Sequence, residues 1–599
     1  MDGIASSTVL ASRWLADFGA ALEARDLRQA GSMLAADCCW RDLLSFTWNI
    51  VTVEGPEAIE RMLGATLAEA RPSRWSLLGE ASAADGIVEA WFEFETAAAR
   101  GLGHLRLKDG RCRTLLTTAK ELKGFEERRG AARERGVEHG VVRDRRSWLE
   151  RKTEEEARLG HDTQPYCVIV GGGQGGIALA ARLKQLAVPT IVLERNARAG
   201  DSWRNRYKSL CLHDPVWYDH MPYLPFPDHW PVFTPKDQLG DWLEMYVKVM
   251  GLNYWSGSHC RSARFDAARG EWEVAVERAG QRILLRPRHL VLATGMSGVP
   301  KLPEIPGAAG FRGEQHHSSR FESGERHAGK TCVVVGSNNS AHDIAADLWE
   351  HGADVTMIQR SSTMVAKSET LMEFSSGRLY SEAALQRGIG TEKADLMVAS
   401  IPYRLLPEVQ RPIVAALKAR DAALYERLAK AGFMLDFGED DTGLFLKYLR
   451  RGSGYYIDVG ASELVACGDI KLKSGVTVAR IGERSVICSD GTELPAELIV
   501  YATGYGSMNG WAAELISQEV ADKVGKCWGI GSGTAYDPGP WEGELRNMWK
   551  PTRQEALWFH GGNLAQSRFY SQFLAMQLKA RMEGLPTPVY GLPEVHHRE

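Results

Sequence analysis

Two copies of one pattern constrain the fold of this 599-residue chain more than any other feature. Each copy has a short apolar run, a turn of small residues, a stretch of helical length and a second apolar run. The turns begin at Gly171 and Gly336. This order predicts a strand, a tight turn, a helix and a parallel strand, the unit that binds a dinucleotide in doubly wound proteins. We therefore expect an α/β protein with two such units.

The first copy is complete. Its parts are the apolar run at 166–170, the glycine turn at 171–176, the helical stretch at 177–186 and the second apolar run at 190–193. Gly171 permits the tight turn, Gly173 lets backbone approach a pyrophosphate, and Gly176 lets the helix pack closely on the strand. Glu194 ends the second strand, where it would accept hydrogen bonds from an adenosine ribose and repel a 2′-phosphate.

The second copy keeps only the first glycine of its turn. Asn338 stands where backbone would approach the ligand, and Ala341 takes the place of the third glycine; both replacements are tolerated. Its second strand ends in Arg360, which two serines follow. A cation and hydroxyls at this point suit a 2′-phosphate, so the pattern favours NADPH over NADH. A structural unit with a surface arginine is the alternative.

Composition excludes several classes of protein. The 72 basic and 76 acidic residues leave a net charge of −4, which does not favour a nucleic-acid or membrane-surface partner. No secretion signal or membrane-spanning run is read, so a cytoplasmic protein is expected. The ten cysteines have no paired spacing, which predicts neither disulfides nor a metal site.

The region before the first copy, residues 1–124, reads as a separate α+β unit of helices followed by alternating strands. Its element order resembles the NTF2-like or SnoaL-like cone. Asp42 and His104 could face such a cone, yet neither has an evident partner in the sequence, which favours a binding or oligomerisation module over a second catalytic site. An oligomerisation module would be compatible with a homodimer.

Five segments divide the chain. They are the N-terminal unit (1–124), a charged helical linker (125–163), the first part of an FAD-binding domain (164–324), an NADPH-binding domain with a helical insertion at about 370–450 (325–474), and the completion of the FAD-binding domain with a final helix (475–599). Ser147 with Glu150 predicts a capping box at the start of the linker helix.

Residues 311–321 lie between the two copies and carry an ordered set of four residues. Phe311, Gly313, His317 and Phe321 follow the spacing FxGxxxHxxx(F/Y). This spacing resembles the fingerprint of flavin-containing monooxygenases. Segments 200–203, 293–295 and 502–505 resemble further motifs of that family, and segment 207–213 looks like its indole-pyruvate branch. The resemblance covers about 165–599.

The chain departs from the family at a few positions. The family has glycine where Asn338 and Ala341 stand, which bears on how the nicotinamide nucleotide is placed. Glu322 follows Phe321, whereas tryptophan followed by proline would indicate a typical Baeyer–Villiger enzyme.

The resemblance implies an NADPH-dependent flavoprotein monooxygenase. NADPH would reduce FAD, and O₂ would form a flavin C4a-hydroperoxide that passes one oxygen atom to a small organic substrate. The residues implied for FAD are Gly171, Gly173, Gln174, Gly175, Gly176, Glu194, Arg195, Trp203 and Thr294. Those implied for NADPH are Gly336, Ser337, Asn338, Asn339, Ser340, Arg360 and Ser361, while Thr503 and Gly504 would close the chain between the nucleotides and His213 is the catalytic candidate near the flavin.

Other readings stay open at this point. A flavoprotein oxidase that releases H₂O₂ and a Baeyer–Villiger-type oxygenase of a ketone or 2-oxo acid both fit the pattern. A disulfide reductase fits poorly, because only Cys211 lies where a CxxxxC pair is needed. Aromatic residues within 217–233 would wall a substrate pocket or form a packed loop, and residues 561–564 would meet the flavin ring through backbone N–H groups or simply cap the last helix.

Overall fold

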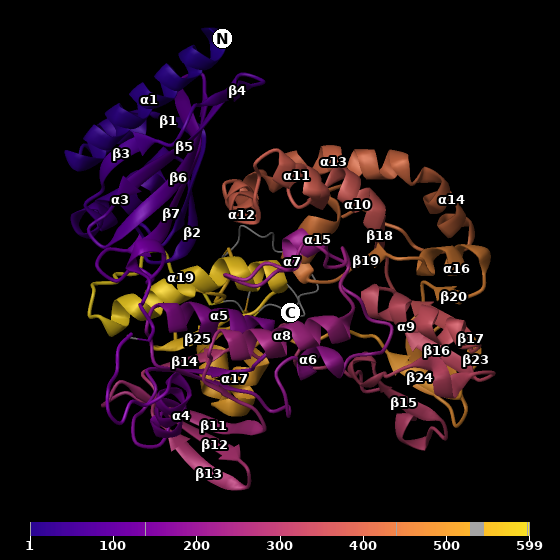
Figure 1. Ribbon diagram of the computed structural model, residues 1–599. Coiled ribbons are helices and arrows are strands. Elements are labelled where there is room, and N and C mark those ends of the chain that lie inside the picture. The colour runs from indigo at the N-terminus through magenta and orange to yellow at the C-terminus, as the bar shows by residue number, and fades with distance from the viewer. Residues whose placement is uncertain (1, 138, 439, 528–543, 596, 598–599) are drawn as a thin grey trace.

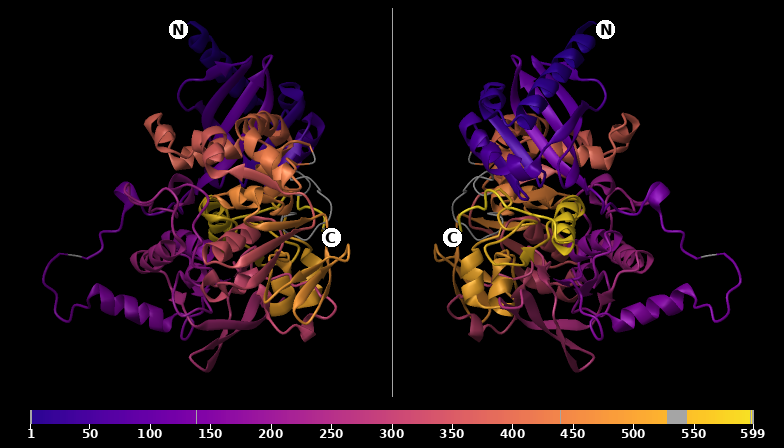
Figure 2. Two further views of the ribbon diagram at one scale, coloured as in Figure 1. Left: turned by 90° about the vertical axis from the view of Figure 1, so that its right-hand side faces the viewer. Right: turned by 90° about the vertical axis from the view of Figure 1, so that its left-hand side faces the viewer.

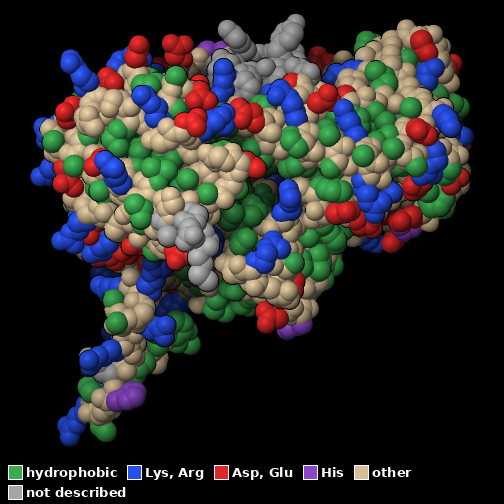
Figure 3. Space-filling view, turned by 90° about the horizontal axis from the view of Figure 1, so that it is seen from above, with side chains coloured by type: hydrophobic (Ala, Val, Ile, Leu, Met, Phe, Trp, Pro, Cys, Tyr) green, Lys and Arg blue, Asp and Glu red, His purple; other side chains and the backbone are tan. Residues whose placement is uncertain are grey.

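The computed structural model describes residues 2–137, 139–438, 440–527, 544–595 and 597. Figure 1 shows an N-terminal unit, a central α/β unit, a second α/β unit and a group of helices above the two α/β units. The expectation of an α/β protein is confirmed. Acidic and basic side chains are interspersed over the face seen in Figure 3, in keeping with the small net charge.

The N-terminal unit is one sheet, mostly antiparallel, with helices on one face. The strand order is β2-β1-β7-β6-β5-β3, with β4 paired to β5. The strands are β1 (Leu34–Leu43), β2 (Ile50–Glu54), β3 (Ser73–Leu77), β4 (Ser82–Ala84), β5 (Ile87–Glu95), β6 (Ala99–Lys108) and β7 (Arg111–Leu122). The helices are α1 (Asp2–Glu23), α2 (Leu27–Ser32) and α3 (Pro56–Ala70).

Aromatic rings fill the side of this sheet that the helices cover. Phe92 and Phe94 on β5 lie over Gly103 and Gly101 on β6, where an added Cβ atom would come within 2.1 and 2.4 Å of the rings. Trp75 stacks on Phe94 with ring centroids 4.9 Å apart. The two glycines thus make room for rings that supply much of the apolar burial of the unit.

The two polar residues singled out in this unit do not share its interior. Asp42 is fully buried there and does have partners: one oxygen accepts from the backbone and hydroxyl of Thr47, and the other from the hydroxyl of Thr117 at 2.7 Å. His104 alternates with Leu105 on β6 and so lies on the opposite face, with Nε2 3.8 Å from a Glu89 oxygen. The carboxylate therefore fixes the turn after β1.

The linker runs out from the body and returns through α4 (Trp148–Arg158), as Figure 2 shows. The Ser147 hydroxyl accepts from the Glu150 backbone at 3.2 Å, and the Glu150 carboxylate accepts from the Ser147 backbone at 2.6 Å. The predicted capping box is confirmed.

The central unit has a parallel sheet in the order β10-β9-β8-β14-β25. Its strands are β8 (Cys167–Val170), β9 (Thr190–Leu193), β10 (Tyr254–Trp255), β14 (His289–Leu292) and β25 (Leu557–Phe559). Antiparallel strands β11 (Ser258–Asp266), β12 (Glu271–Arg278) and β13 (Gln281–Leu285) precede β14. The helices are α5 (Gln174–Gln185), α6 (Asp201–Arg204), α7 (Val216–Asp219), α8 (Lys236–Val249), α17 (Asn509–Leu515), α18 (Gln518–Val524) and α19 (Leu564–Met582).

The second α/β unit has a parallel sheet in the order β15-β24-β16-β17-β20. The strands are β15 (Glu314–His317), β16 (Thr331–Val335), β17 (Asp354–Gln359), β20 (Lys471–Ser474) and β24 (Leu498–Tyr501). Helices α9 (Asn339–Glu350) and α16 (Ala461–Cys467) pack on it, and β21 (Val478–Ile481), β22 (Ser485–Cys488) and β23 (Glu493–Pro495) form an antiparallel addition.

The strands of this sheet come from three of the expected segments, 164–324, 325–474 and 475–599, and not from 325–474 alone. Strand β15 comes before residue 325 and β24 comes after residue 474, yet both pair within the second sheet. The pairing of β24 with β16 was not predicted, because parallel neighbours far apart in the chain share no local signature.

The helical insertion is α10 (Ser368–Phe374), α11 (Glu382–Gln386), α12 (Thr391–Ala399), α13 (Leu406–Arg420), α14 (Ala422–Lys430) and α15 (Gly443–Arg451). Strands β18 (Met364–Lys367) and β19 (Tyr455–Asp458) pair in parallel at its two ends. The helices therefore leave and rejoin the second unit at one place.

Buried polar contacts join the N-terminal unit to the rest of the protein. Arg41, 1% exposed, lies 2.6 Å from a carboxylate oxygen of Glu544 and donates to the backbone oxygen of Ala399 and the hydroxyl of Tyr570. Lys550 donates to the backbone oxygen of Ile50 at 2.7 Å. The unit is thus bound at several buried points and does not merely hang from its linker.

Lys550 predicts a pH-dependent stability. Burial lowers the pKa of this lysine from 10.5 to about 7. Between these values the unfolded chain binds a proton that the folded chain does not, so the free energy of unfolding should rise with pH by up to about 1.4 kcal/mol per unit. Urea unfolding from about pH 7 to about pH 9 measures it, with Lys550→Met expected to flatten the rise. Equal slopes for both proteins would contradict the prediction.

Candidate active site

The turn between β8 and α5 has the shape that a pyrophosphate needs. Gly171 has a φ of +108°, and an added Cβ would lie 2.3 Å from the Ala293 oxygen; at Gly176 it would lie 2.0 Å from the Gly171 oxygen. At Gly173 it would meet only the Ser202 hydroxyl, at 3.6 Å. Gly173 is the N-cap residue of α5, and it has no side chain that could bond to the backbone N–H groups of the first turn. Backbone N–H groups at this helix terminus can therefore receive an anion.

Glu194 lies beside this turn. Its side chain is 6% exposed and accepts from the backbone of Gly172 and of Asn196, both at 2.8 Å. The hydroxyl of Tyr254 donates to the Gly172 oxygen at 2.8 Å, which secures the turn from the other side. Arg195 is exposed at the same edge. The acid predicted to meet the ribose is thus at the turn, held by backbone donors.

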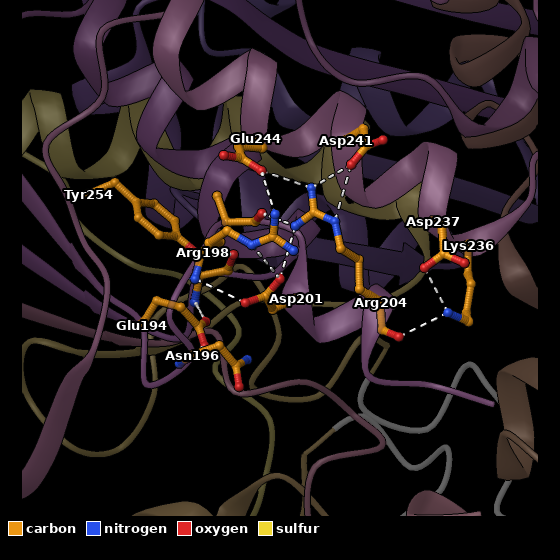
Figure 4. A network of polar contacts seen from close by, with 12 residues as sticks. Glu194, Asn196, Arg198, Asp201, Arg204, Lys236, Asp237, Asp241, Glu244 and Tyr254 are labelled. Carbon is orange, nitrogen blue, oxygen red and sulfur yellow. Dashed lines mark hydrogen bonds and ion pairs between the residues drawn. The ribbon is translucent and has the colours of Figure 1, made fainter. Parts of the chain in front are cut away.

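A network of ion pairs, drawn in Figure 4, fixes the short helix α6 that follows. Arg204 on α6 lies 2.9 Å from Asp201, 2.8 Å from Asp241 and 2.9 Å from Glu244. Lys236 on α8 donates to the Arg204 backbone at 2.9 Å. These contacts bind α6 to α8 and hold the loop beyond β9 against the central unit.

Gln174 connects three segments of the candidate site. Its side-chain oxygen accepts from the indole of Trp203 on α6 at 3.2 Å, and its nitrogen donates to the Gly562 oxygen at 3.3 Å. Gly562 directly precedes Asn563, the N-cap residue of α19. The first turn of α5, α6 and the start of α19 therefore converge, although Gly562 is 388 positions from Gln174.

The start of α19 faces a group of tyrosines. Asn563 forms a capping box with Gln566, and its side chain donates to the hydroxyl of Tyr218 at 3.2 Å. The hydroxyl of Tyr448, from the helical insertion, donates to Gln566 at 2.5 Å. Tyr218 contacts Tyr380 edge-on, with centroids 4.8 Å apart. Residues 561–564 therefore lead into the cap of α19 and also lie beside the candidate site.

The aromatic residues after α6 divide into two groups. Tyr218 on α7 contacts Asn563 at the start of α19. Phe226 and Trp230 instead stack with centroids 5.2 Å apart, and both contact Trp242 on α8. The first group faces the candidate site, and the second forms the packed loop that was the alternative reading.

The turn between β16 and α9 repeats the first turn in a modified form. Gly336 has a φ of +132°, and an added Cβ would lie 2.5 Å from the Ala502 oxygen. Asn338 caps α9 without a side-chain hydrogen bond to it, and Ser340 lies in its first turn. The side chains of Ser337 and Asn339 are used within the fold, bonding to the Thr363 hydroxyl and to the backbone of β19 respectively. Arg360 and Ser361 are exposed at the end of β17.

The segments between the two units are linked by His317. Its Nε2 lies 3.0 Å from the Gly504 oxygen, and its ring contacts Tyr505 edge-on. Burial lowers the pKa of this histidine. Thr503 donates to the Lys301 backbone at 2.5 Å, and the buried hydroxyl oxygen of Thr294 has no hydrogen-bond partner among the residues described. Residues 502–508 connect β24 of the second unit to α17 of the central unit and are called the crossing segment. His317 holds this segment in place through Gly504.

His213, expected near the flavin, contacts helix α9 of the second unit. Its Nε2 lies 3.7 Å from the carboxylate of Asp343 on α9, which also accepts from the Tyr207 hydroxyl at 2.7 Å. Burial raises the pKa of Asp343. The segment after α6 thus reaches across to the helix that follows the second turn.

One buried ion pair beside Tyr218 was not predicted from the sequence. Arg568 on α19 lies 2.9 Å from Asp395 on α12, and the two side chains are 4% and 7% exposed. Arg568 also donates to the backbone oxygens of Tyr218 and His220, and Tyr380 donates to Asp395 at 2.9 Å. No motif relates the two partners, so only the fold reveals them.

Two absences hold for the described ranges. No group of His, Cys, Asp or Glu among these residues could hold a metal ion, and no helix there is long and apolar enough to cross a membrane. All ten cysteines are free, and Cys211 has no cysteine partner.

Comparison with known proteins shows the family of the chain. Residues 266–390 match the family model for pyridine nucleotide-disulphide oxidoreductases. Indole-3-pyruvate monooxygenase YUCCA1 of Oryza sativa subsp. japonica is 31% identical over 370 residues, 60% of this chain and 82% of the relative. Probable indole-3-pyruvate monooxygenase YUCCA7 of Arabidopsis thaliana is 28% identical over 418 residues, 65% and 89% of the two chains. The closed crystal structure of cyclohexanone monooxygenase, with a TM-score of 0.50, 15% identity and coverage of 70% and 85%, supports the fold.

Fold and site define a two-nucleotide flavoprotein. The chain belongs to the flavin-containing monooxygenase family. It is an NADPH-dependent flavoprotein monooxygenase that uses FAD and NADPH, as the sequence predicted, and the oxidase and Baeyer–Villiger alternatives are not favoured.

Proposed function

We propose that FAD lies across the turn between β8 and α5, with its ring directed toward Gln174 and Asn563. The open position at Gly173 carries this assignment, because a Cβ there would meet almost nothing in the protein while the helix terminus beneath it is free for an anion. FAD held there would supply the chemistry of hydride acceptance from NADPH and of O₂ activation.

The residues around that position orient and enclose the ring in this proposal. Gln174 and Trp203 would hold it in register with α19, and His317 would keep the crossing segment against the nicotinamide side. Tyr218 and Tyr448 would cover the substrate side and limit the entry of water. In this assignment His213 positions the two units through Asp343.

We assign NADPH to the turn between β16 and α9. The free N-terminus of α9 would receive the pyrophosphate, and Arg360 and Ser361 the 2′-phosphate, while Asn339 would serve the fold. The two nucleotide units would then be Rossmann-type, with β15 and β24 counted in the second.

Arg360→Ala tests the 2′-phosphate assignment. Losing an exposed charge-assisted contact should raise KM for NADPH about tenfold or more and leave KM for NADH within about twofold. Anaerobic flavin reduction with each nucleotide measures this, and Arg320→Ala, at another position on the same unit, serves as control. Equal effects on both nucleotides would count against Arg360.

We propose that the N-terminal unit is an NTF2-like domain with a structural role. Its interior is filled by aromatic rings and its buried carboxylate, Asp42, is committed to the turn after β1. A cytoplasmic location and a homodimer stay predictions from the sequence.

The substrate is a small organic molecule, and indole-3-pyruvate is the first compound to test because relatives carry it in their names. The decisive experiment reduces the yellow protein anaerobically with NADPH, admits O₂ with the compound, and compares oxygenated product with H₂O₂. One product molecule per NADPH supports the proposal. Release of one H₂O₂ per NADPH with every candidate would refute oxygen insertion.

A further inference from the structure

A cavity of about 170 Å³ lies between the N-terminal unit and the central unit. Its walls include Leu102 of β6, Ala119 of β7, Leu396 of α12 and both Phe569 and Met576 of α19. For comparison, a dry apolar cavity of about 150 Å³ holds benzene. The space suits one aromatic ring or an aliphatic group of similar size.

The position of the cavity is fixed because the contacts that hold its walls are buried. Arg41 bonds to the last residue of α12 and to Tyr570 on α19, and Arg106 donates to the backbone and hydroxyl of Ser400 next to α12. Figure 1 shows α12 beside the N-terminal sheet. The N-terminal unit thus forms one wall and also positions a second.

At its inner end the cavity reaches the ion pair of Arg568 and Asp395. Immediately beyond this pair lie Tyr380, bonded to Asp395, and Tyr218, bonded to Asn563. From Asn563 to Arg568 is five residues of helix, about 7.5 Å along its axis. One layer of side chains therefore separates the cavity from the place assigned to the flavin ring.

At its outer end the cavity meets the linker. Tyr223 donates to Glu127, and Arg182 lies over the Tyr223 ring, 4.6 Å from its centroid. Tyr223 is 36% exposed, so this group borders solvent. The cavity thus runs from a polar mouth at the surface to a neutralised ion pair at the site.

We propose that this cavity, defined here as the entry chamber, is the route by which the organic substrate reaches the flavin, and that it favours an uncharged group the size of one ring. The inference rests on the proposed function. Charged side chains such as Glu126 and Arg182 also line the chamber, so its walls are mixed. The apolar side chains of Leu102, Leu396, Phe569 and Met576 attract such a group, and Arg568 offers no net charge because Asp395 neutralises it. The N-terminal unit then helps to select substrates without touching the reacting atoms.

Filling the entry chamber tests the proposal. Leu396→Trp narrows it from α12 and Leu102→Trp from the N-terminal sheet, while Lys393→Trp adds the same ring at an exposed position on α12 outside the chamber. The probes are methyl phenyl sulfide and the much smaller dimethyl sulfide. Sulfoxide formation is measured for each, together with anaerobic flavin reduction by NADPH, which does not use the chamber.

Both chamber variants should lower kcat/KM for methyl phenyl sulfide about tenfold or more, with dimethyl sulfide and flavin reduction within about twofold of wild type. Lys393→Trp should match wild type. If both chamber variants keep the wild-type kcat/KM for methyl phenyl sulfide, the entry chamber proposal is overturned. The proposed function would not be affected by that result. If wild type releases one H₂O₂ per NADPH with both sulfides and with every other candidate, the proposed function falls and the inference falls with it.

Discussion

Gly173→Val is expected to give a folded protein that lacks FAD. The added Cβ meets only a hydroxyl at 3.6 Å, and the extended backbone of Gly173 (φ −75°, ψ −172°) suits a β-branched residue. The valine methyl groups would instead occupy the space through which a pyrophosphate approaches the helix terminus. We expect FAD affinity to fall about 100-fold or more, equivalent to about 2.7 kcal/mol.

Flavin absorbance per mole of purified protein, with urea unfolding beside it, measures this result. The free energy of unfolding of the apoprotein should change by about 1 kcal/mol or less. Gly176→Val is the contrasting variant, because its Cβ would lie 2.0 Å from a backbone oxygen and should destabilise the fold itself. A yellow Gly173→Val protein with one FAD per chain would refute the placement of the cofactor.

Arg41→Met is expected to destabilise the whole protein by about 3–5 kcal/mol, because it leaves the Glu544 carboxylate buried without its cation. The backbone oxygen of Ala399 and the hydroxyl of Tyr570 lose a donor as well. Urea or thermal unfolding measures the change. In contrast, Arg74→Met, which breaks an ion pair whose arginine is 77% exposed, should cost less than about 1 kcal/mol.

The double variant Arg41→Met with Glu544→Met separates two explanations. If the loss comes from the stranded charge, removing both charges should recover much of the stability. If it comes from lost packing of the arginine, the double variant should be at least as unstable as the single one. A single variant as stable as wild type would mean that the N-terminal unit is held by other contacts.

Local signals were sufficient for the elements to which we assign the nucleotides. Apolar runs and glycine spacing located β8, α5, β16 and α9, and two residues three positions apart predicted the cap of α4. These features depend on neighbours in sequence, which is why they could be found there.

Features made by distant residues were not predictable in the same way. Strand β25 has three residues, too few for a pattern, and β15 carries two histidines in place of an apolar run. The pairs Arg568 with Asp395 and Arg41 with Glu544 join segments that have no motif in common. His213 was placed by analogy, and its contact with Asp343 depends on how the two units meet.

Each parallel sheet contains a strand made late in synthesis. Strand β25 completes the first sheet and β24 lies between β15 and β16 in the second, and both come after residue 490. Residues Glu544 and Lys550, which bind the N-terminal unit, are later still than β24. A growing chain can therefore form its local helices and hairpins early, but the ribosome must release nearly all of it before either nucleotide unit closes.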